Sequence, residues 1–347
     1  MEWIKLMSIK PMEICVLGGG SFGTALSHLL GINGHCVNQW MRDPKIADSI
    51  INNRENPKYF PNIKLNENIH PILSIKEAVE NCPLIFVSIP SKAFRTVLSE
   101  VGDFVEGSQL IVTTTKGIEK STFKTMAEII CEETCLLKIG ALSGPNLAGE
   151  IMENQLTGTV IASKFDEVIY VVQNVLASSN IRVYGNRDLF GVELGGTLKN
   201  IYAVASGLIS ALGMGENTRS LVITRGLAEM SRFAHSRGAD AMTFIGLAGM
   251  GDLIATCSSN KSRNFQIGYQ LGKGLSLKDA IDQIGQVAEG VGTIEVVHKK
   301  AVEENIRMPI LAGLYAILFE NKSVKNTMIN LMSLTQTIDV EFQTGIN

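Results

Sequence analysis

The sequence of 347 residues predicts an α/β N-terminal domain built on a doubly wound sheet, followed by an all-α C-terminal domain. In the first half, short apolar runs that resemble buried parallel strands alternate with helical segments, and this alternation is typical of doubly wound sheets. From about residue 191 the strand-like runs disappear and helical periodicity replaces them. The length also favours two domains, at roughly 150 residues each.

The predicted strands share an apolar character and lie at residues 14–17, 36–40, 84–89, 110–114, 139–143, 159–162 and 181–184. Helical stretches fill the gaps, and Ser74 can cap one of them with Glu77 completing a capping box. Residues 201–214 form an apolar stretch too short for a bilayer crossing of about 20 residues, so we expect a buried core helix. A second helix is expected at 217–235, and a last helix with a frayed tail at 321–347.

A glycine-rich turn follows the first predicted strand. Gly18, Gly20 and Gly23 form a G-x-G-x-x-G run that opens a helical stretch, the context in which this motif binds a dinucleotide pyrophosphate. Gly18 permits the tight turn, Gly20 lets the backbone approach the phosphates, and Gly23 lets the helix pack close to the strand. The N–H groups of the helix start then face the phosphates. An ordinary strand-to-helix turn is the alternative.

This motif gives the expected domains a chemistry. We expect an N-terminal extension at residues 1–11, a Rossmann-type dinucleotide-binding domain at 12–190, a helical substrate and catalytic domain at 191–335, and a tail at 336–347. The boundary near 190 is set by the last strand-like run.

Composition excludes several classes of partner. The chain has 31 basic and 34 acidic residues, so no global positive field attracts nucleic acid or an anionic membrane. The six cysteines lack metal-site spacing, apart from the near-pair Cys131 and Cys135, and we expect reduced thiols in a cytoplasmic protein. The first eleven residues lack the apolar core of a signal peptide. The five histidines are scattered, so we assign none to catalysis and expect no metal.

Arg42 follows the second predicted strand, where NAD-binding folds usually place an acidic ribose ligand. Its guanidinium can bind a 2′-phosphate or stack on adenine, so we expect NADP to be accepted at least as well as NAD. Asp43 could bind the ribose hydroxyls or neutralise Arg42 instead. A solvated turn arginine before Pro44 is the simpler alternative.

Two further loops follow strands at the edge where open α/β sheets bind their ligands. Lys116, after the strand at 110–114, is a candidate for holding an anionic substrate or the nicotinamide-side ribose. Residues 143–146 offer backbone N–H groups beside the same crevice, although turn chemistry alone would explain Gly144 and Pro145.

Lys199 lies in a predicted helix with Gly195, Gly196 and Ala203 three or four residues away, beside its amine. Small neighbours leave room for a ligand. They can also bury the lysine, which lowers the ammonium pKa from about 10.4 toward roughly 7 to 8, where it works as an acid near neutrality. A snorkelling surface lysine is the alternative.

Two polar features follow in the helical half. Asp252 follows Gly249 and Gly251 in the sequence and can orient a lysine. The run 258–264 can form an oxyanion clamp with Arg263 as its charged member. A plain helix cap and a plain loop are the alternatives.

Taken in order, these motifs resemble those of the bacterial NAD(P)-dependent glycerol-3-phosphate dehydrogenases, over nearly the whole length from Met12. The matching segments are Gly-Gly-Gly-Ser-Phe-Gly-Thr-Ala at 18–25, Thr-Lys-Gly-Ile-Glu at 115–119, Ser-Gly-Pro at 143–145, Glu-Leu-Gly-Gly-Thr-Leu-Lys-Asn at 193–200, Thr-Arg-Gly-Leu-Ala-Glu-Met at 224–230, Gly-Met-Gly-Asp-Leu at 249–253, Ser-Arg-Asn at 262–264 and Gly-Gln-Val-Ala-Glu-Gly at 285–290. Other Rossmann dehydrogenases share only the first.

The resemblance implies that dihydroxyacetone phosphate and sn-glycerol 3-phosphate are interconverted by hydride transfer, supplying the backbone of phospholipids. Lys199 matches the family's proton-transferring lysine. The positions that match substrate contacts are Lys116, Gly144, Asn146, Lys199, Asp252, Ser262, Arg263 and Asn264. The positions that match cofactor contacts, beside the three glycines, are Ser21, Phe22, Arg42, Lys116, Ala148, Arg263, Val287 and Glu289. Asn146 replaces a threonine common in bacterial members.

The expected ligands are therefore NADP or NAD and a phosphorylated triose, with no nucleic acid and no membrane insertion. The oligomeric state stays open, a homodimer included. Two other functions are also open at this point. One is a 6-phosphogluconate or 3-hydroxyacid dehydrogenase, and the other is a nucleotide-sensing module without chemistry, against which the presence of Lys199 and Arg263 argues.

Overall fold

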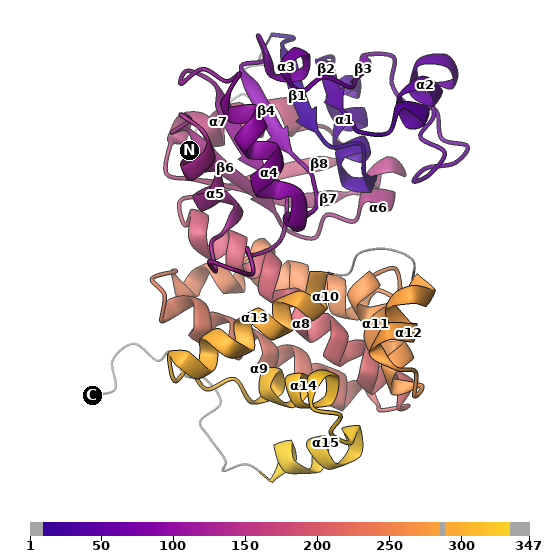
Figure 1. Cartoon of the computed structure of the whole chain (residues 1–347), viewed down its shortest axis with the longest axis vertical. Coiled ribbons are helices and arrows are strands. Elements are labelled where there is room, and N and C mark those ends of the chain that lie inside the picture. The colour runs from indigo at the N-terminus through magenta and orange to yellow at the C-terminus, as the bar shows by residue number, and fades with distance from the viewer. Residues whose placement is uncertain (1–9, 285–288, 334–347) are drawn as a thin grey trace. The chain divides into compact units, whose positions relative to one another are not determined.

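The structure is a computed structural model that describes residues 10–284 and 289–333. It divides into two compact units, residues 1–193 and 194–347, and each is described by itself (Figure 1). Every strand in the described part of the chain lies in the first unit. The strands are β1 (Glu13–Leu17), β2 (Cys36–Trp40), β3 (Ile69–Ile72), β4 (Leu84–Val87), β5 (Leu110–Thr113), β6 (Ile139–Ser143), β7 (Thr157–Ser163) and β8 (Ile181–Asn186).

These strands form one sheet in the order β3-β2-β1-β4-β5-β6-β7-β8. The first six are parallel, and their order 3-2-1-4-5-6 is that of a doubly wound dinucleotide-binding sheet. The predicted fold class is thus confirmed. β7 pairs antiparallel with β6, and β8 runs parallel to β7, a reversal that the alternation of apolar runs does not reveal.

The bounds of the predicted strands lie within two residues of the observed ones, but one edge strand was not predicted. Residues 36–40 and 139–143 match, whereas β4 ends at Val87 because the chain turns at Pro90 into the next helix. β3 was missed. It carries Pro71, which central strands exclude but an edge strand tolerates, because only one side of β3 needs ladder hydrogen bonds.

Helices cover both faces of the sheet. The helices of the first unit are α1 (Ser21–Ile32), α2 (Pro44–Asn53), α3 (Ile75–Val79), α4 (Ser91–Gly102), α5 (Met126–Glu133), α6 (Ala148–Met152) and α7 (Asp166–Leu176). Alternate residues of each strand face opposite layers, so Ile85 and Val87 pack with α3, α4 and α5, whereas Leu84 and Phe86 pack with α1 and α7. Each face thus has its own hydrophobic core.

Local helix signals in this unit are partly as predicted. The Ser74 side chain accepts a hydrogen bond from the Glu77 backbone N–H at the start of α3. A complete capping box, with both reciprocal bonds, occurs instead at Thr125 and Glu128 of α5.

The second unit is helical throughout its described residues, as predicted. It continues α8 (Leu189–Ala211), which begins in the first unit, and adds α9 (Glu216–His235), a 3₁₀ turn (Ala241–Ile245), a π turn (Leu247–Gly251), α10 (Asp252–Ser258), α11 (Arg263–Gly272), α12 (Leu277–Ile284), α13 (Glu289–Glu303), α14 (Pro309–Phe319) and α15 (Val324–Met332). Residues 201–209 of α8 are buried, as expected for a core helix. The expected tail at 336–347 lies outside the described residues.

The cysteines and the helix lengths bear on the expectations from composition. All six cysteines are free thiols. Within the residues that the structure describes, no helix is both long and apolar enough to cross a bilayer.

Candidate active site

The glycine turn connects β1 to α1 at the switch point of the sheet, where β1 lies between β2 and β4. Gly18 has φ +137°, and a Cβ there would lie 2.1 Å from the carbonyl oxygen of Ser88, just after β4. A Cβ at Gly23 would lie 2.2 Å from the Gly18 carbonyl oxygen. The tight turn and the close helix packing predicted for these two residues are therefore present.

Gly20 differs from its two neighbours in the motif. It is the N-cap residue of α1, with φ −78° and ψ −177°, and no atom lies within 4 Å of a Cβ built on it. The protein itself therefore has no need of glycine at this position. Because the α1 N-cap has no side chain to accept from the first-turn N–H groups, the space beside Gly20 suits an anion such as a pyrophosphate.

Two buried amides hold this turn, and sequence reasoning missed both. Gln39 of β2 donates to the Gly18 carbonyl oxygen at 3.0 Å, and Asn56 donates to the Gly19 carbonyl oxygen at 3.2 Å. Both residues are fully buried. A glutamine inside the otherwise apolar run Cys-Val-Asn-Gln-Trp was a signal that could have found the first of them.

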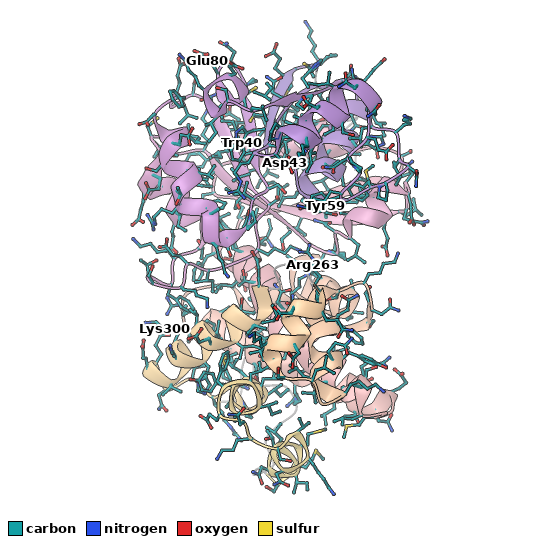
Figure 2. All side chains as sticks on the ribbon, turned by 45° about the vertical axis from the view of Figure 1, so that its right-hand side comes forward. Trp40, Asp43, Tyr59, Glu80, Arg263 and Lys300 are labelled. Atoms are coloured by element: carbon teal, nitrogen blue, oxygen red, sulfur yellow. The ribbon has the colours of Figure 1, made fainter. Side chains whose placement is uncertain are left out.

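Ser21 and Phe22 open α1 and are half-buried. Phe22 lines a small apolar cavity, which Asn146 also lines. Arg42 is exposed two residues after β2 and has no hydrogen-bond or ion-pair partner among the described residues. Asp43 does not pair with it. Its carboxylate instead caps α2 by accepting from the Lys45 N–H at 3.0 Å, and Figure 2 labels it near the end of β2 at Trp40.

Lys116 and the loop after β6 are brought together. The Lys116 ammonium donates to the Gly144 carbonyl oxygen at 3.1 Å, and both residues follow the carboxyl ends of neighbouring strands. The Asn146 amide nitrogen donates to the Thr159 hydroxyl at 2.9 Å, so one of its two N–H groups is used inside the protein. Ala148 is the first residue of α6.

In the second unit, Lys199 is buried on α8 and forms an ion pair with Asp252. Its ammonium also donates to the Thr256 hydroxyl at 2.6 Å. Asp252 and Thr256 lie one turn apart on α10, which places both on the face toward Lys199. The predicted meeting of Asp252 with Lys199 occurs. Thr256 was missed, although its spacing of four from Asp252 was a usable signal.

The prediction that the small residues beside Lys199 leave room for a ligand was wrong at Gly195. A Cβ at Gly195 would lie 2.7 Å from the Ala248 carbonyl oxygen, so the backbone of the π turn fills that space. This close approach also brings the start of α10, which carries Asp252, up to α8.

Cys257 is buried among these residues. Burial raises the pKa of its thiol to about 11, so the thiol stays neutral at ordinary pH. A neutral thiol is a poor nucleophile, so Cys257 supplies no reactive thiolate to this cluster.

The polar run 258–264 is partly a helix start. The Ser262 hydroxyl caps α11 by accepting from the Phe265 N–H at 3.3 Å. Arg263 is exposed at the first position of α11 (Figure 2), and Asn264 is buried with its carboxamide oxygen accepting from the Gly290 N–H at 3.0 Å. Glu289 begins α13, and Val287 lies outside the described residues.

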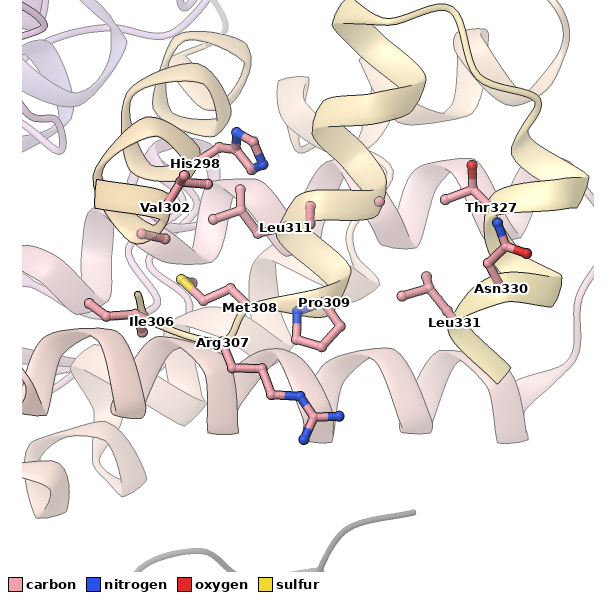
Figure 3. A pocket seen from close by; sticks show the side chains of 13 residues that line it. His298, Val302, Ile306, Arg307, Met308, Pro309, Leu311, Thr327, Asn330 and Leu331 are labelled. Atoms are coloured by element: carbon pink, nitrogen blue, oxygen red, sulfur yellow. The ribbon is translucent and has the colours of Figure 1, made fainter. Parts of the chain in front are cut away.

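The second unit also has a cavity of about 430 Å³ among α13, α14, α15 and the chain that joins the first two (Figure 3). Its lining is mostly apolar and includes Pro309 and Leu311 of α14 and Leu331 of α15. None of the predicted site residues within the described part of the chain lines it. This cavity is therefore separate from the Lys199 cluster.

A parallel sheet with a glycine turn at its switch point, joined to a helical unit with a buried lysine and carboxylate pair, defines the class of two-domain dinucleotide-dependent dehydrogenases. Models of the N-terminus and the C-terminus of NAD-dependent glycerol-3-phosphate dehydrogenase match residues 13–169 and 188–329. The chain belongs to this family.

Individual relatives agree. The chain is 53% identical to a Pseudomonas fluorescens protein named glycerol-3-phosphate dehydrogenase (NAD(P)+), over 96% of this chain and 97% of that one. A protein of the same name from Pseudomonas entomophila is 52% identical over the same shares. The crystal structure of glycerol-3-phosphate dehydrogenase from Coxiella burnetii is 34% identical, with a TM-score of 0.89 over 93% of this chain and 99% of that one.

Proposed function

We propose that this chain carries out the reaction of its family with Lys199 as the proton donor. The chain is an NAD(P)-dependent oxidoreductase that interconverts dihydroxyacetone phosphate and sn-glycerol 3-phosphate by hydride transfer. The observation that carries the assignment of Lys199 is its burial against Asp252 and Thr256, because an amine held by two partners has a fixed direction for proton transfer.

The residues of the glycine turn fit a nicotinamide dinucleotide. The open space beside Gly20 admits a pyrophosphate, and the α1 N-terminus supplies N–H donors to it. When bound, the cofactor supplies the hydride. We propose that Ser21, Phe22 and Arg42 contribute to its binding. We propose the same for Lys116, Ala148, Arg263, Val287 and Glu289.

The chemistry required of the protein is to bind a phosphate and to neutralise a developing alkoxide. During ketone reduction negative charge grows on the carbonyl oxygen, and an ammonium aimed at that oxygen stabilises the charge and donates the proton. We propose that Lys199 does this, while Asp252 and Thr256 hold its amine. For the remaining substrate contacts we propose Lys116, Gly144, Asn146, Ser262, Arg263 and Asn264.

The test is a set of lysine variants assayed with dihydroxyacetone phosphate and both reduced cofactors. Lys199→Ala should lower kcat at least a hundredfold and leave the cofactor dissociation constant nearly unchanged, because a general acid acts on charge of the transition state. Lys199→Arg keeps a positive partner for buried Asp252 but holds its proton too tightly to release it, so it should be equally inactive while folding normally. The exposed Lys278→Ala is the control and should retain full activity. More than one tenth of the wild-type kcat in both Lys199 variants would exclude this role.

We propose three further properties of this enzyme. The domain division at residues 12–190 and 191–335 can be tested by expressing the two segments separately. A homodimer is tested by light scattering on the purified chain. We also propose that the enzyme is cytoplasmic and supplies phospholipid synthesis. Its activity should then be found in the soluble fraction of cells, and deletion of the gene should lower their phospholipid content.

A further inference from the structure

The start of α13 is attached to α11 by one buried hydrogen bond. Gly290, the second residue of α13, donates its backbone N–H to the carboxamide oxygen of Asn264 at 3.0 Å. The first four N–H groups of a helix have no acceptor within the helix. Asn264 therefore acts as a cap for α13, although it lies 26 residues away in the chain.

The same contact leaves no space for a side chain at residue 290. A Cβ on Gly290 would lie 2.6 Å from the Asn264 Oδ1 atom and 2.9 Å from the carbonyl oxygen of Asn200. Asn200 directly follows Lys199 on α8. The start of α13 is thus packed between Asn264 of α11 and the backbone of α8 at Asn200.

The N–H of Gly290 also decides how the Asn264 carboxamide is oriented. Only the oxygen of a carboxamide accepts a hydrogen bond, so Oδ1 faces Gly290 and the Nδ2 group points away from it. Asn264 is 9% exposed, and Nδ2 has no partner among the described residues. This arrangement presents a donor, which suits a phosphate oxygen.

We propose that Asn264 serves both ligands of the enzyme: its amide donates to the substrate phosphate, while its oxygen holds the start of α13 and with it Glu289. This inference rests on the proposed function, in which Glu289 contacts the cofactor. Toward the cofactor Asn264 is a positioning residue. Cofactor affinity should therefore depend on a residue that itself binds only the substrate.

Two substitutions of nearly the same shape separate the two roles. Asn264→Asp keeps an oxygen for the Gly290 N–H, and its negative charge is favourable at a helix N-terminus. Asn264→Leu removes the acceptor. Both variants lose the amide donor, so both should raise the KM for dihydroxyacetone phosphate.

The deciding measurement is the NADH dissociation constant without substrate, by fluorescence titration. Loss of one buried hydrogen bond should raise this constant about three- to tenfold in Asn264→Leu, whereas Asn264→Asp should stay within twofold of wild type. Hydrogen exchange of the Gly290 amide should be slow in wild type and Asn264→Asp and fast in Asn264→Leu. Thermal melts of the three proteins establish that each is folded.

Each of the other results overturns the proposal. Unchanged NADH affinity in both variants, or equal weakening in both, would show that the acceptor does not control the cofactor site. An unchanged KM for dihydroxyacetone phosphate in both variants would overturn the substrate half of the proposal. Failure of the proposed function would look different, because Glu289→Gln would then leave the NADH dissociation constant unchanged.

Discussion

Glu229 and Tyr202 share a 3.0 Å hydrogen bond in the core of the helical unit, from the Tyr202 hydroxyl to the Glu229 carboxylate. The same carboxylate accepts from the N–H groups of Ile310 at 2.7 Å and Leu311 at 3.2 Å, so it caps α14. α14 has no side-chain cap of its own. A glutamate of α9 therefore joins three helices.

The first prediction concerns pH and stability. Burial raises the pKa of Glu229 from 4.5 to about 7, against the opposing effect of its hydrogen bonds and of Arg232. Between these values the folded protein holds a proton that the unfolded chain has released. This contribution to stability is therefore complete below pH 4.5 and is lost as the pH rises to about 7, by roughly 3 kcal/mol for such a shift.

Glu229→Gln should remove this part of the pH dependence. Urea unfolding at several pH values between 4.5 and 8 measures the difference between variant and wild type. Glu216→Gln on the same helix is the control, because that side chain is 79% exposed, and its curve should follow the wild type. Parallel curves for wild type and Glu229→Gln would contradict the raised pKa.

The second prediction uses Gly20. Because nothing lies within 4 Å of a Cβ there and the backbone is extended, Gly20→Ala should change the free energy of unfolding by less than about 0.5 kcal/mol. It should weaken cofactor binding at least tenfold, since the methyl group occupies the space for the pyrophosphate. Gly215→Ala is matched, because Gly215 is also an N-cap with an extended backbone and open surroundings. Equal cofactor affinity in both variants would refute the proposed pyrophosphate site beside Gly20.

The third prediction concerns the choice of cofactor. The exposed Arg42 guanidinium can donate charged hydrogen bonds to the 2′-phosphate of NADPH. NADH has only a neutral 2′-hydroxyl at that position. Arg42→Ala should therefore weaken NADPH more than NADH, by about 1.5 to 3 kcal/mol. Dissociation constants for both cofactors decide this, with the exposed Arg182→Ala as control. An equal loss for the two would mean that Arg42 stacks on adenine or shapes the loop.

The fourth prediction concerns the phosphate of the substrate. Arg263→Ala should raise the KM for dihydroxyacetone phosphate sharply and lower kcat as well, because remote binding energy positions the reacting carbonyl. The effect should be much smaller with unphosphorylated dihydroxyacetone. Lys278→Ala removes an exposed cation outside the run 258–264 and should have little effect. Similar losses with both ketones would argue against a phosphate contact.

Local chemistry determined much of this protein from sequence. The order of apolar runs predicted the doubly wound sheet, because buried parallel strands need nearly continuous apolar residues. The glycine motif predicted its own packing, since Gly18 and Gly23 meet backbone atoms that no side chain could approach. The pairing of Lys199 with Asp252 was also within reach, because a charge buried beside small residues needs a partner.

Other features were decided only by tertiary structure. The reversal of β7 is set by its antiparallel pairing with β6. The amides of Gln39 and Asn56 under the glycine turn, and the capping of α13 by Asn264, join segments far apart in the chain. The space expected beside Gly195 belongs to the backbone at Ala248 for the same reason. Periodicity and motif spacing report the neighbours of a residue along the chain, whereas the partner of a buried polar group is set by which elements the core packs together.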